Sequence, residues 1–437
     1  MGIGGAGMSA VARLLLAHGQ VSGSDAGHWP LGDALLPLGV TVHDAFAARH
    51  VAGADVVVRS SAYGVTNVEV AEAERRGIPV WKRHDAWKLL AGGKRVVAVS
   101  GTHGKTTTTA MVWSALRAGG VDASLICGAR LRDLGSNAHL GRDATLVIEA
   151  DEYDNAFLAL DPEVAVVLNV EHDHVDLFPT ETAYREAFRA FARRVKPGGA
   201  LVVCADDPGA RGLAAVDAVT YGTSADAGYR VVPAADGHAL RLPDGATVPL
   251  RPRVPGLHNV LNGAAAIAAA ALLGVAPRSA SEGVASFGGT ERRLEELGRE
   301  DDVLVVDDYA HHPSELRASI EALRPRGSRI VAVFQPHTPS RLAAFSAGFS
   351  AVLRDADAAV VAETFSSARE GALEGGARAL ADASGARYAR DPDDAARIAA
   401  DLARPGDVVL IAGAGDIRAA GVALLALLRA RAATTVS

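Results

Sequence analysis

The sequence is short of several residue types that mark particular classes of protein. Its two cysteines, Cys127 and Cys204, lie in apolar stretches, so they can form neither a disulfide framework nor a cysteine zinc site. We expect both to be buried packing residues. The formal net charge of −7 argues against a nucleic-acid-binding surface, which needs clustered Lys and Arg. Lysine is scarce: the 437 residues include only Lys82, Lys88, Lys94, Lys105 and Lys196.

Membrane-directing segments are also lacking. The sequence does not begin with the pattern of a signal peptide, which is a charged segment followed by an apolar segment and a cleavage site. We therefore expect that the protein is not secreted. The longest apolar run, near residues 260–275, contains Asn262 and glycines. It is typical of a small-residue helix in a protein core rather than of a membrane span. We therefore expect a soluble cytoplasmic protein without membrane insertion.

The sequence does contain a regular alternation of short Val/Ile/Ala strands with amphipathic helices. This alternation is typical of α/β proteins with parallel sheets, and the length predicts two to three domains. We place three domains at 1–91, 92–297 and 298–437. A polar, turn-rich insert from Tyr221 to Pro255 predicts small antiparallel strands. The clearest predicted strands are Val21–Ser24, Val40–His43, Asp55–Ser60, Arg95–Ser100, Thr145–Glu149, Val164–Asn169, Asp302–Val306, Ile330–Phe334, Ala358–Ala362 and Val408–Ala412.

The most specific local signal is a glycine-rich turn between a buried strand and a helix. Glycines let backbone amides converge on phosphate oxygens at the helix N-terminus, Lys105 adds a mobile positive charge, and the Thr106 hydroxyl can ligate Mg²⁺. Val99 stands where the first glycine of G-x-x-x-x-G-K-[ST] would be, and a turn that binds nothing is the alternative. We expect the phosphate loop to comprise Gly101, Thr102, His103, Gly104, Lys105, Thr106 and Thr107.

A second glycine-rich segment, Gly2–Gly7, satisfies G-x-G-x-x-G, and Asp25 follows the strand-like Val21–Ser24. Alone, this is a dinucleotide-binding signature, but its physical basis is a diphosphate close to backbone amides, which UDP also has. Because a separate ATP loop is present, we favour a UDP-sugar, with an NAD-dependent oxidoreductase as the alternative. Only Met1 precedes this loop, so we expect about five to eight apolar-rich residues upstream in the natural chain.

Acidic and histidine-containing segments follow several predicted strands. Residues 149–154 read E-A-D-E-Y-D and residues 169–176 read N-V-E-H-D-H-V-D. Since ligands gather beyond the carboxyl ends of parallel strands, we expect both segments to face the phosphate loop and to suit Mg²⁺. Solvated loop charge is the alternative. Further segments are H-N-V-L-N from His258, D-D-Y-A-H-H-P from Asp307 and F-Q-P-H from Phe334.

In this order, the segments resemble the Mur ligases of peptidoglycan assembly over essentially the whole chain. The resemblance implies a Rossmann-like UDP-binding domain, a central ATPase domain and a Rossmann-like C-terminal domain. It also implies that ATP, with Mg²⁺, converts the lactyl carboxylate of UDP-N-acetylmuramate into an acyl phosphate, which the amine of L-alanine attacks. A family member that reattaches recycled peptide is the alternative, expected to differ at F-Q-P-H. We expect a monomer or weak homodimer.

The resemblance further implies roles for individual residues. On the ATP side these are Lys105 at the β/γ-phosphates, Arg293 at the γ-phosphate, Asp308 at the ribose, and His258, Asn259 and Asn262 at the adenine. Thr106 and Glu149 would bind a first Mg²⁺ and His174 a second. The residues implied for the UDP-sugar are Gly4, Gly5, Ser24, Asp25, Ser60 and Ser61. Those implied for the acceptor amino acid are Tyr309, His311, His337 and Arg341, in a small pocket where either histidine could accept the amine proton.

Three positions depart from the family pattern, and one of them is Pro339, which replaces an aromatic residue. Thr338 follows the histidine of Q-P-H, where many members have a basic residue, so we expect a weaker electrostatic hold on the acceptor and a high KM for alanine. Some Mur ligases carry a carbamylated lysine in Y-x-x-A-K shortly after D-H-x-D. Here Phe188 occupies that position, so we expect no carbamate, with His174 and water at the second Mg²⁺.

Overall fold

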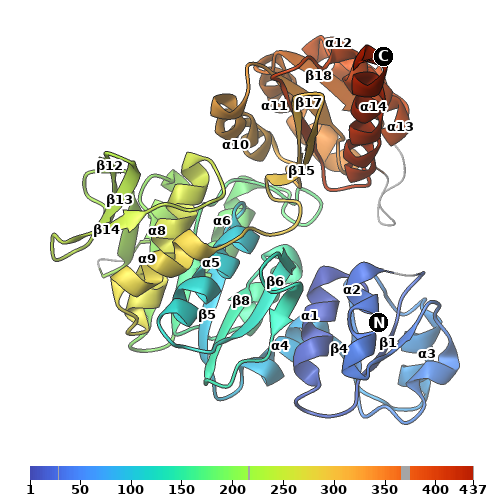
Figure 1. Cartoon of the computed structure of the whole chain (residues 1–437). Coiled ribbons are helices and arrows are strands. Elements are labelled where there is room, and N and C mark those ends of the chain that lie inside the picture. The colour runs from blue at the N-terminus through green and yellow to red at the C-terminus, as the bar shows by residue number, and fades with distance from the viewer. Residues whose placement is uncertain (28, 215–216, 366–374, 437) are drawn as a thin grey trace. The chain divides into compact units, whose positions relative to one another are not determined.

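A computed structural model describes residues 1–27, 29–214, 217–365 and 375–436. The chain divides into two compact units (Figure 1). The first comprises Met1–His172, Leu177–Arg253 and Asn259–Thr290, and the second comprises Asp173–Asp176, Val254–His258 and Glu291–Ser437. Among the described residues, none of the helices combines the length and the hydropathy needed to cross a membrane.

The N-terminal part of the first unit contains two short parallel strand pairs, β1 with β2 and β3 with β4. The Met1 backbone lies between them, because its amino group donates to the Val58 carbonyl oxygen and the Gly2 amide donates to that of Ser24. The elements are α1 (Ala6–Leu15), β1 (Ser22–Ser24), α2 (Pro30–Asp33), η1 (Leu36–Leu38), β2 (Thr41–His43), η2 (Ala48–Val51), β3 (Val57–Arg59), α3 (Val68–Arg75), β4 (Val80–Lys82) and α4 (Arg83–Ala91).

The rest of the first unit is built on a ten-stranded sheet in the order β14-β13-β12-β11-β10-β9-β5-β8-β6-β7. Seven neighbouring strands, β12 to β6 in that order, are parallel, whereas β12-β13-β14 and β6-β7 pair antiparallel. The strands are β5 (Arg95–Ser100), β6 (Ser124–Leu131), β7 (Ser136–His139), β8 (Thr145–Glu149), β9 (Val164–Val167), β10 (Ala200–Cys204), β11 (Val219–Gly222), β12 (Tyr229–Ala234), β13 (Gly237–Arg241) and β14 (Thr247–Leu250).

Apolar, mostly β-branched runs explain the buried strands, since the side chains of β5 from Val96 onward and all of β9 are buried. Such runs are typical of parallel strands covered on both faces. The helices of this part are α5 (Lys105–Ala118), η3 (Tyr153–Ala159), α6 (Glu181–Ala192), α7 (Pro208–Arg211), α8 (Leu257–Leu272) and α9 (Pro277–Ser286). The expected antiparallel insert, the small-residue helix near 260–275 and the burial of both cysteines are confirmed.

The second unit has a six-stranded sheet in the order β15-β16-β20-β17-β18-β19. All neighbours are parallel except β15, which runs antiparallel to β16. β15 begins at Glu295, before the expected start of the third domain at residue 298. The strands are β15 (Glu295–Glu300), β16 (Val303–Asp308), β17 (Ile330–Phe334), β18 (Ala358–Ala362), β19 (Arg387–Ala389) and β20 (Val408–Ala412).

Helices pack on this sheet around a core of small and branched apolar residues that includes Val331, Val409 and Leu424. They are α10 (Pro313–Leu323), η4 (Arg324–Arg326), α11 (Pro339–Arg354), α12 (Gly376–Ser384), α13 (Pro392–Leu402) and α14 (Arg418–Val436). Asp308 and Phe334 are the last residues of β16 and β17, the two strands that flank β20. The motifs that continue from them, D-Y-A-H-H-P and Q-P-H, therefore leave the same edge of the sheet.

Candidate functional site

The predicted phosphate loop joins β5 to α5, as the sequence indicated. Gly101 and Gly104 both adopt positive φ angles, +140° and +83°. A Cβ on Gly101 would lie 3.1 Å from the Leu168 backbone nitrogen, and one on Gly104 would lie 2.9 Å from the Asn262 side-chain oxygen. Glycine is therefore required at both positions, because a side chain would be strained and crowded there.

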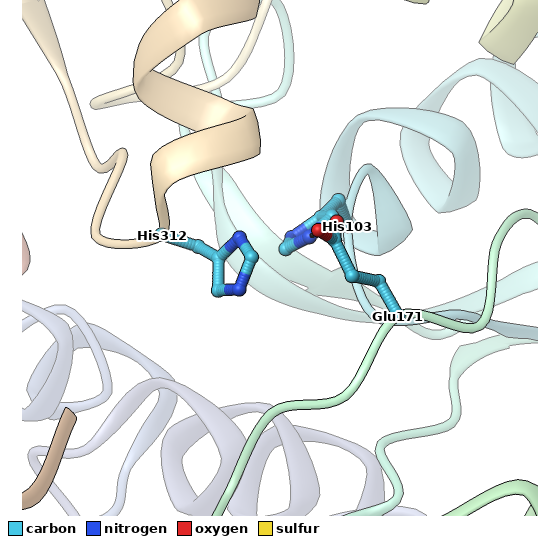
Figure 2. Close-up of side chains that lie close together, drawn as sticks. All are labelled: His103, Glu171 and His312. Carbon is cyan, nitrogen blue, oxygen red and sulfur yellow. Dashed lines mark hydrogen bonds and ion pairs between the residues drawn. The ribbon is translucent and has the colours of Figure 1, made fainter. Parts of the chain in front are cut away.

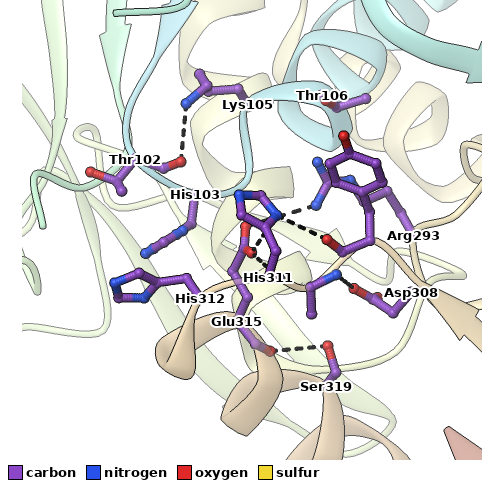
Figure 3. Close-up of polar contacts among 12 residues, drawn as sticks. Thr102, His103, Lys105, Thr106, Arg293, Asp308, His311, His312, Glu315 and Ser319 are labelled. Carbon is purple, nitrogen blue, oxygen red and sulfur yellow. Dashed lines mark hydrogen bonds and ion pairs between the residues drawn. The ribbon is translucent and has the colours of Figure 1, made fainter. Parts of the chain in front are cut away.

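Lys105 begins α5 and turns its ammonium group back over the loop (Figure 3). The group donates to the Gly101 carbonyl oxygen, to that of Thr102 at 3.0 Å, and to the Glu152 carboxylate at 3.0 Å. Burial alone would lower the pKa of Lys105, but Glu152 raises it above its ordinary value. Glu152 is fully buried and also accepts from the Tyr184 hydroxyl at 2.9 Å. Lys105 is thus a charged group held at the phosphate loop.

Thr106 and Glu149, the two predicted ligands of the first Mg²⁺, are in direct contact. The Thr106 hydroxyl donates to Glu149 Oε1 at 3.0 Å, while the Gly128 amide donates to Oε2 at 2.6 Å. A hydroxyl and a carboxylate are hard oxygen donors of the kind that Mg²⁺ prefers. The donor set therefore fits this ion, with Thr107 buried beside them on α5.

His103 is fixed by residues at the end of β9. Its amide donates to the Asn169 side-chain oxygen at 2.7 Å, and its Nε2 lies 3.0 Å from the Glu171 carboxylate (Figure 2). Asn169 and Glu171 belong to the segment 169–176 that was expected to face the phosphate loop, and for these two residues the expectation is confirmed. Asn262 on α8 donates to Asn259 at 3.2 Å and adjoins Gly104, so these two predicted adenine-side residues lie together beside the loop.

The expectation that the segment 149–154 faces the phosphate loop is confirmed only in part. Glu149 and Glu152 do face it, but Asp151 lies 2.5 Å from Arg83 and Asp154 lies 2.8 Å from Lys82. These two ion pairs join the segment to the start of α4. Left-handed backbone at Asp154 turns the chain away, with φ of +56°.

Gly4 and Asp25 are linked within the first unit. The Gly4 amide donates to Asp25 at 2.8 Å, and the Tyr63 hydroxyl donates to the same carboxylate at 3.0 Å. Trp29, 49% exposed, covers Gly4, where an added Cβ would lie 2.4 Å from the Trp29 Cβ. Asp25 therefore holds the glycine loop in place.

The other predicted UDP-sugar residues lie around this loop. Ser24 donates to the buried Glu69, and Ser60 donates its amide to the Met1 carbonyl oxygen. Gly5 precedes α1, and Ser61 is exposed. The amides of Ala6 and Gly7, in the first turn of α1, meet no acceptor within the described ranges, so they remain available to an anion.

In the second unit, Asp308 ends β16 directly before Tyr309, and Arg293 lies over the Tyr309 ring and close to Asp308. Asp308 accepts from the Leu294 and Ala310 amides, each at 2.8 Å, and burial raises its pKa to about 6. The Arg293 guanidinium lies 5.1 Å from the Tyr309 ring centroid and 3.8 Å from Glu315 (Figure 3). The predicted ribose and γ-phosphate residues are thus brought together.

The four predicted acceptor residues also gather in this unit. The Tyr309 and His311 ring centroids are 5.4 Å apart and those of His311 and His337 are 6.3 Å apart. His337 Nδ1 lies 3.5 Å from Arg341 Nη1. Burial lowers the pKa of His311 to about 3, so this ring is neutral at pH 7.

Two further predicted residues, His258 and His174, belong to the second unit by their contacts. Burial lowers the pKa of His258 to about 4. His174 has a left-handed backbone, with φ of +50°. It follows Asp173, whose carboxylate accepts from Arg341 Nε at 3.0 Å and from Nη2 at 3.1 Å. The sequence did not predict this pair.

Family models match the chain in three consecutive stretches. "Mur ligase family, catalytic domain" matches residues 1–95, "Mur ligase middle domain" matches 99–270, and "Mur ligase, glutamate ligase domain" matches 292–415. With its phosphate loop on a parallel sheet and a second α/β unit, the chain is a multidomain α/β nucleotide-binding ligase. It belongs to the Mur ligase family.

Individual relatives match nearly end to end. The UDP-N-acetylmuramate–L-alanine ligases of Kineococcus radiotolerans and Mycolicibacterium vanbaalenii are each 43% identical, over 99% of this chain and 96% of the relative. The crystal structure of such a ligase from Thermotoga maritima has a TM-score of 0.82 at 27% identity, covering 99% of this chain and 98% of that one. A murein peptide ligase from Psychrobacter arcticus has a TM-score of 0.74 at 25% identity, covering 98% of both chains. The predicted three-domain α/β architecture is confirmed.

Proposed function

We propose that this chain is an ATP-dependent ligase that joins L-alanine to the lactyl carboxylate of UDP-N-acetylmuramate, in peptidoglycan precursor synthesis. The observation that carries the proposal is the end-to-end match to ligases named for this reaction, at 42–43% identity over 97–99% of the chain for seven relatives. The murein peptide ligase is less similar, which favours alanine over recycled peptide. The ATP loop disfavours an NAD-dependent oxidoreductase.

A free carboxylate is a poor electrophile, so the reaction needs an activated form. The lactyl carboxylate attacks the γ-phosphorus of ATP, giving an acyl phosphate and ADP. The alanine amine then attacks the acyl carbon, and inorganic phosphate leaves as the amide forms. Lys105, held at the loop, would neutralise the β/γ-phosphates, and Arg293 would contact the γ-phosphate. Such catalysis consists mostly of positioning and charge neutralisation.

Mg²⁺ is part of the proposal, since the Thr106 and Glu149 oxygens suit a hard cation. When bound, the ion would neutralise phosphate charge. We assign Thr106 and Glu149 to the first ion and His174 to a second. Asp308 would contact the ribose, with His258, Asn259 and Asn262 on the adenine side.

For the amine proton we favour His311 because its ring is held in one tautomer, although burial lowers its pKa and so makes it a weak base before substrate binds. Its Nδ1 lies 3.0 Å from the Tyr309 carbonyl oxygen, and a neutral ring that donates from Nδ1 keeps Nε2 as the proton acceptor. His337 is the alternative. His311→Asn is expected to lower kcat more than His337→Asn does. If His337→Asn lowered kcat more, His337 would instead be the residue that accepts the amine proton.

The UDP-sugar is assigned to the loop that contains Gly4 and Gly5. Its diphosphate would meet the Ala6 and Gly7 amides, with Arg83 close by: a Cβ on Gly7 would lie 2.5 Å from the Arg83 guanidinium. Ser24 and Asp25 would act mainly by shaping this loop, and Ser60 and Ser61 would line its rim. We further propose domains at 1–91, 92–297 and 298–437, and a cytoplasmic monomer or weak homodimer.

The proposal is tested by a coupled assay of ADP release. Release should require both UDP-N-acetylmuramate and L-alanine, and Lys105→Met should abolish it. A tripeptide replacing L-alanine as the preferred acceptor would favour the recycling reaction instead. NADH oxidation without ADP release would reject the ligase altogether.

A further inference from the structure

The Asp173–Arg341 pair is almost withdrawn from water. Asp173 is 3% exposed and Arg341 is 8% exposed. Asp173 accepts two hydrogen bonds, from Nε and Nη2, which together form one edge of the planar guanidinium. Two parallel hydrogen bonds fix the plane of the group as well as its position. Removal of one partner from such a buried pair leaves an uncompensated charge.

A guanidinium has five N–H donors, and a second pairing edge lies between Nη1 and Nη2. Asp173 uses the Nε–H and one Nη2–H, so the other Nη2–H and one Nη1–H form this second edge, while the remaining Nη1–H points back toward Cδ. His337 Nδ1 lies 3.5 Å from Nη1, which places the second edge beside the predicted acceptor residues. An acceptor carboxylate can pair there bidentately while Asp173 keeps the first edge.

We propose that Asp173 is a positioning residue for the acceptor amino acid: it holds Arg341 by the Nε/Nη2 edge, so that the Nη1/Nη2 edge receives the α-carboxylate of the acceptor. This inference rests on the proposed ligation of L-alanine. In this arrangement the carboxylates of the protein and of the acceptor occupy opposite edges of one cation. A side chain with a single point of charge cannot fill both positions.

The opposite arrangement makes an opposite prediction. If Asp173 occupied the acceptor's own position, its removal would free Arg341 and lower the KM for alanine. If it positions Arg341, its removal frees the guanidinium to rotate and raises that KM. The sign of the change therefore separates the two cases.

The test uses the full chain with Asp173→Asn, which keeps the shape of the side chain but turns an amide donor toward the arginine. We expect the KM for L-alanine to rise about tenfold or more, equivalent to about 1.4 kcal/mol per decade. The KM for ATP and kcat at saturating alanine should change less than about threefold. Asp173→Glu, which retains the carboxylate, should recover part of the loss. An unchanged or lowered KM for alanine in Asp173→Asn overturns the inference.

Asp355→Asn is the matched control, since it removes the partner of the exposed Arg317 in the same unit. It should leave every KM unchanged. The pair itself is tested without any assay of activity, by thermal unfolding of Asp173→Asn, Arg341→Lys and the double variant. Non-additive shifts in Tm are expected, and additive shifts overturn the inference even if the chain ligates alanine. Absence of alanine-dependent ADP release in the unaltered chain counts instead against the proposed function.

Discussion

In the acceptor pocket proposed above, Arg341 is the residue on which recognition of the acceptor carboxylate would depend. Thr338, at the N-terminus of α11, supplies no second cation where many family members have a basic residue. We predict that Arg341→Lys raises the KM for L-alanine by about tenfold or more, because an ammonium cannot hold both Asp173 and the acceptor in a fixed plane. ADP-release kinetics with each substrate varied in turn measure this. Arg354→Lys on the same helix is the control, and weaker ATP binding with alanine spared would show that the pocket is misassigned.

His258 makes the free energy of unfolding depend on pH in the acidic range. Its pKa falls from an ordinary 6.5 to about 4 in the folded chain because of burial, so the unfolded chain binds more protons between these values. This contribution to stability is complete above about pH 6.5 and is lost as the pH falls through 4, by up to about 3 kcal/mol. Asp308 acts oppositely, since its raised pKa favours the folded chain below pH 6.

Comparison with a variant isolates the histidine. We predict that His258→Gln unfolds with a free energy that depends less on pH between 6.5 and 4 than that of the unaltered chain, because the Asp308 contribution is common to both. Urea unfolding at several pH values measures the difference. Parallel pH profiles for the two proteins would contradict the assignment.

At the scale of elements, α6 shows why no carbamate is expected. Phe188 is fully buried, with its ring centroid 5.4 Å from that of Phe157 and 5.2 Å from that of Tyr184. The position of the modified lysine in some relatives is thus part of an aromatic cluster. We predict that ADP release in CO₂-free buffer is unchanged by added bicarbonate. A clear rescue by bicarbonate after decarboxylation at low pH would contradict this.

The elements themselves could largely be predicted from the sequence, because buried parallel strands such as β5 and β9 are unbroken apolar runs. The phosphate loop could be predicted for the same reason: its glycines and Lys105 stand between such a strand and a helix. What could not be predicted is the direction of side chains once a strand has ended. The Glu152 carboxylate contacts Lys105, whereas the Asp154 carboxylate contacts Lys82. The chain changes direction here because Asp154 and Asn155 are consecutive residues with left-handed backbone.

The Asp173–Arg341 pair could not be predicted from the sequence for another reason. Its partners are 168 residues apart, and neither position has a local pattern that indicates a buried charge. Each was assigned instead to a nearby motif, D-H-x-D or the helix after Q-P-H. Only the tertiary fold brings them together.

At the scale of the molecule, the first unit links its glycine loop to its phosphate-loop sheet through Arg83. This guanidinium pairs with Asp151, lies 4.8 Å from the Trp87 ring centroid and abuts Gly7. We predict that Arg83→Ala lowers the free energy of unfolding by about 1–2 kcal/mol, through loss of the ion pair and the cation–π contact. The KM for the UDP-sugar should rise several-fold, with that for alanine nearly unchanged.

Thermal unfolding and ADP-release kinetics check both effects. Arg76→Ala is the matched control, because it removes an exposed arginine that pairs with Glu72 on α3. If the two substitutions had equal effects on stability and on the KM for the UDP-sugar, Arg83 would not link the glycine loop to the phosphate-loop sheet as inferred here.

Trp29 covers Gly4 and is exposed to solvent, so its intrinsic fluorescence can report on the glycine loop. Two of the other three tryptophans, Trp87 and Trp113, are 1% and 3% exposed, so an aqueous quencher such as acrylamide reaches Trp29 far more readily than either. If the glycine loop binds the diphosphate of the UDP-sugar as proposed, the bound group would lie near the Trp29 side chain, which covers Gly4, and would shield the indole. Intrinsic fluorescence quenching can thus follow occupancy of the loop directly, with no label and without turnover.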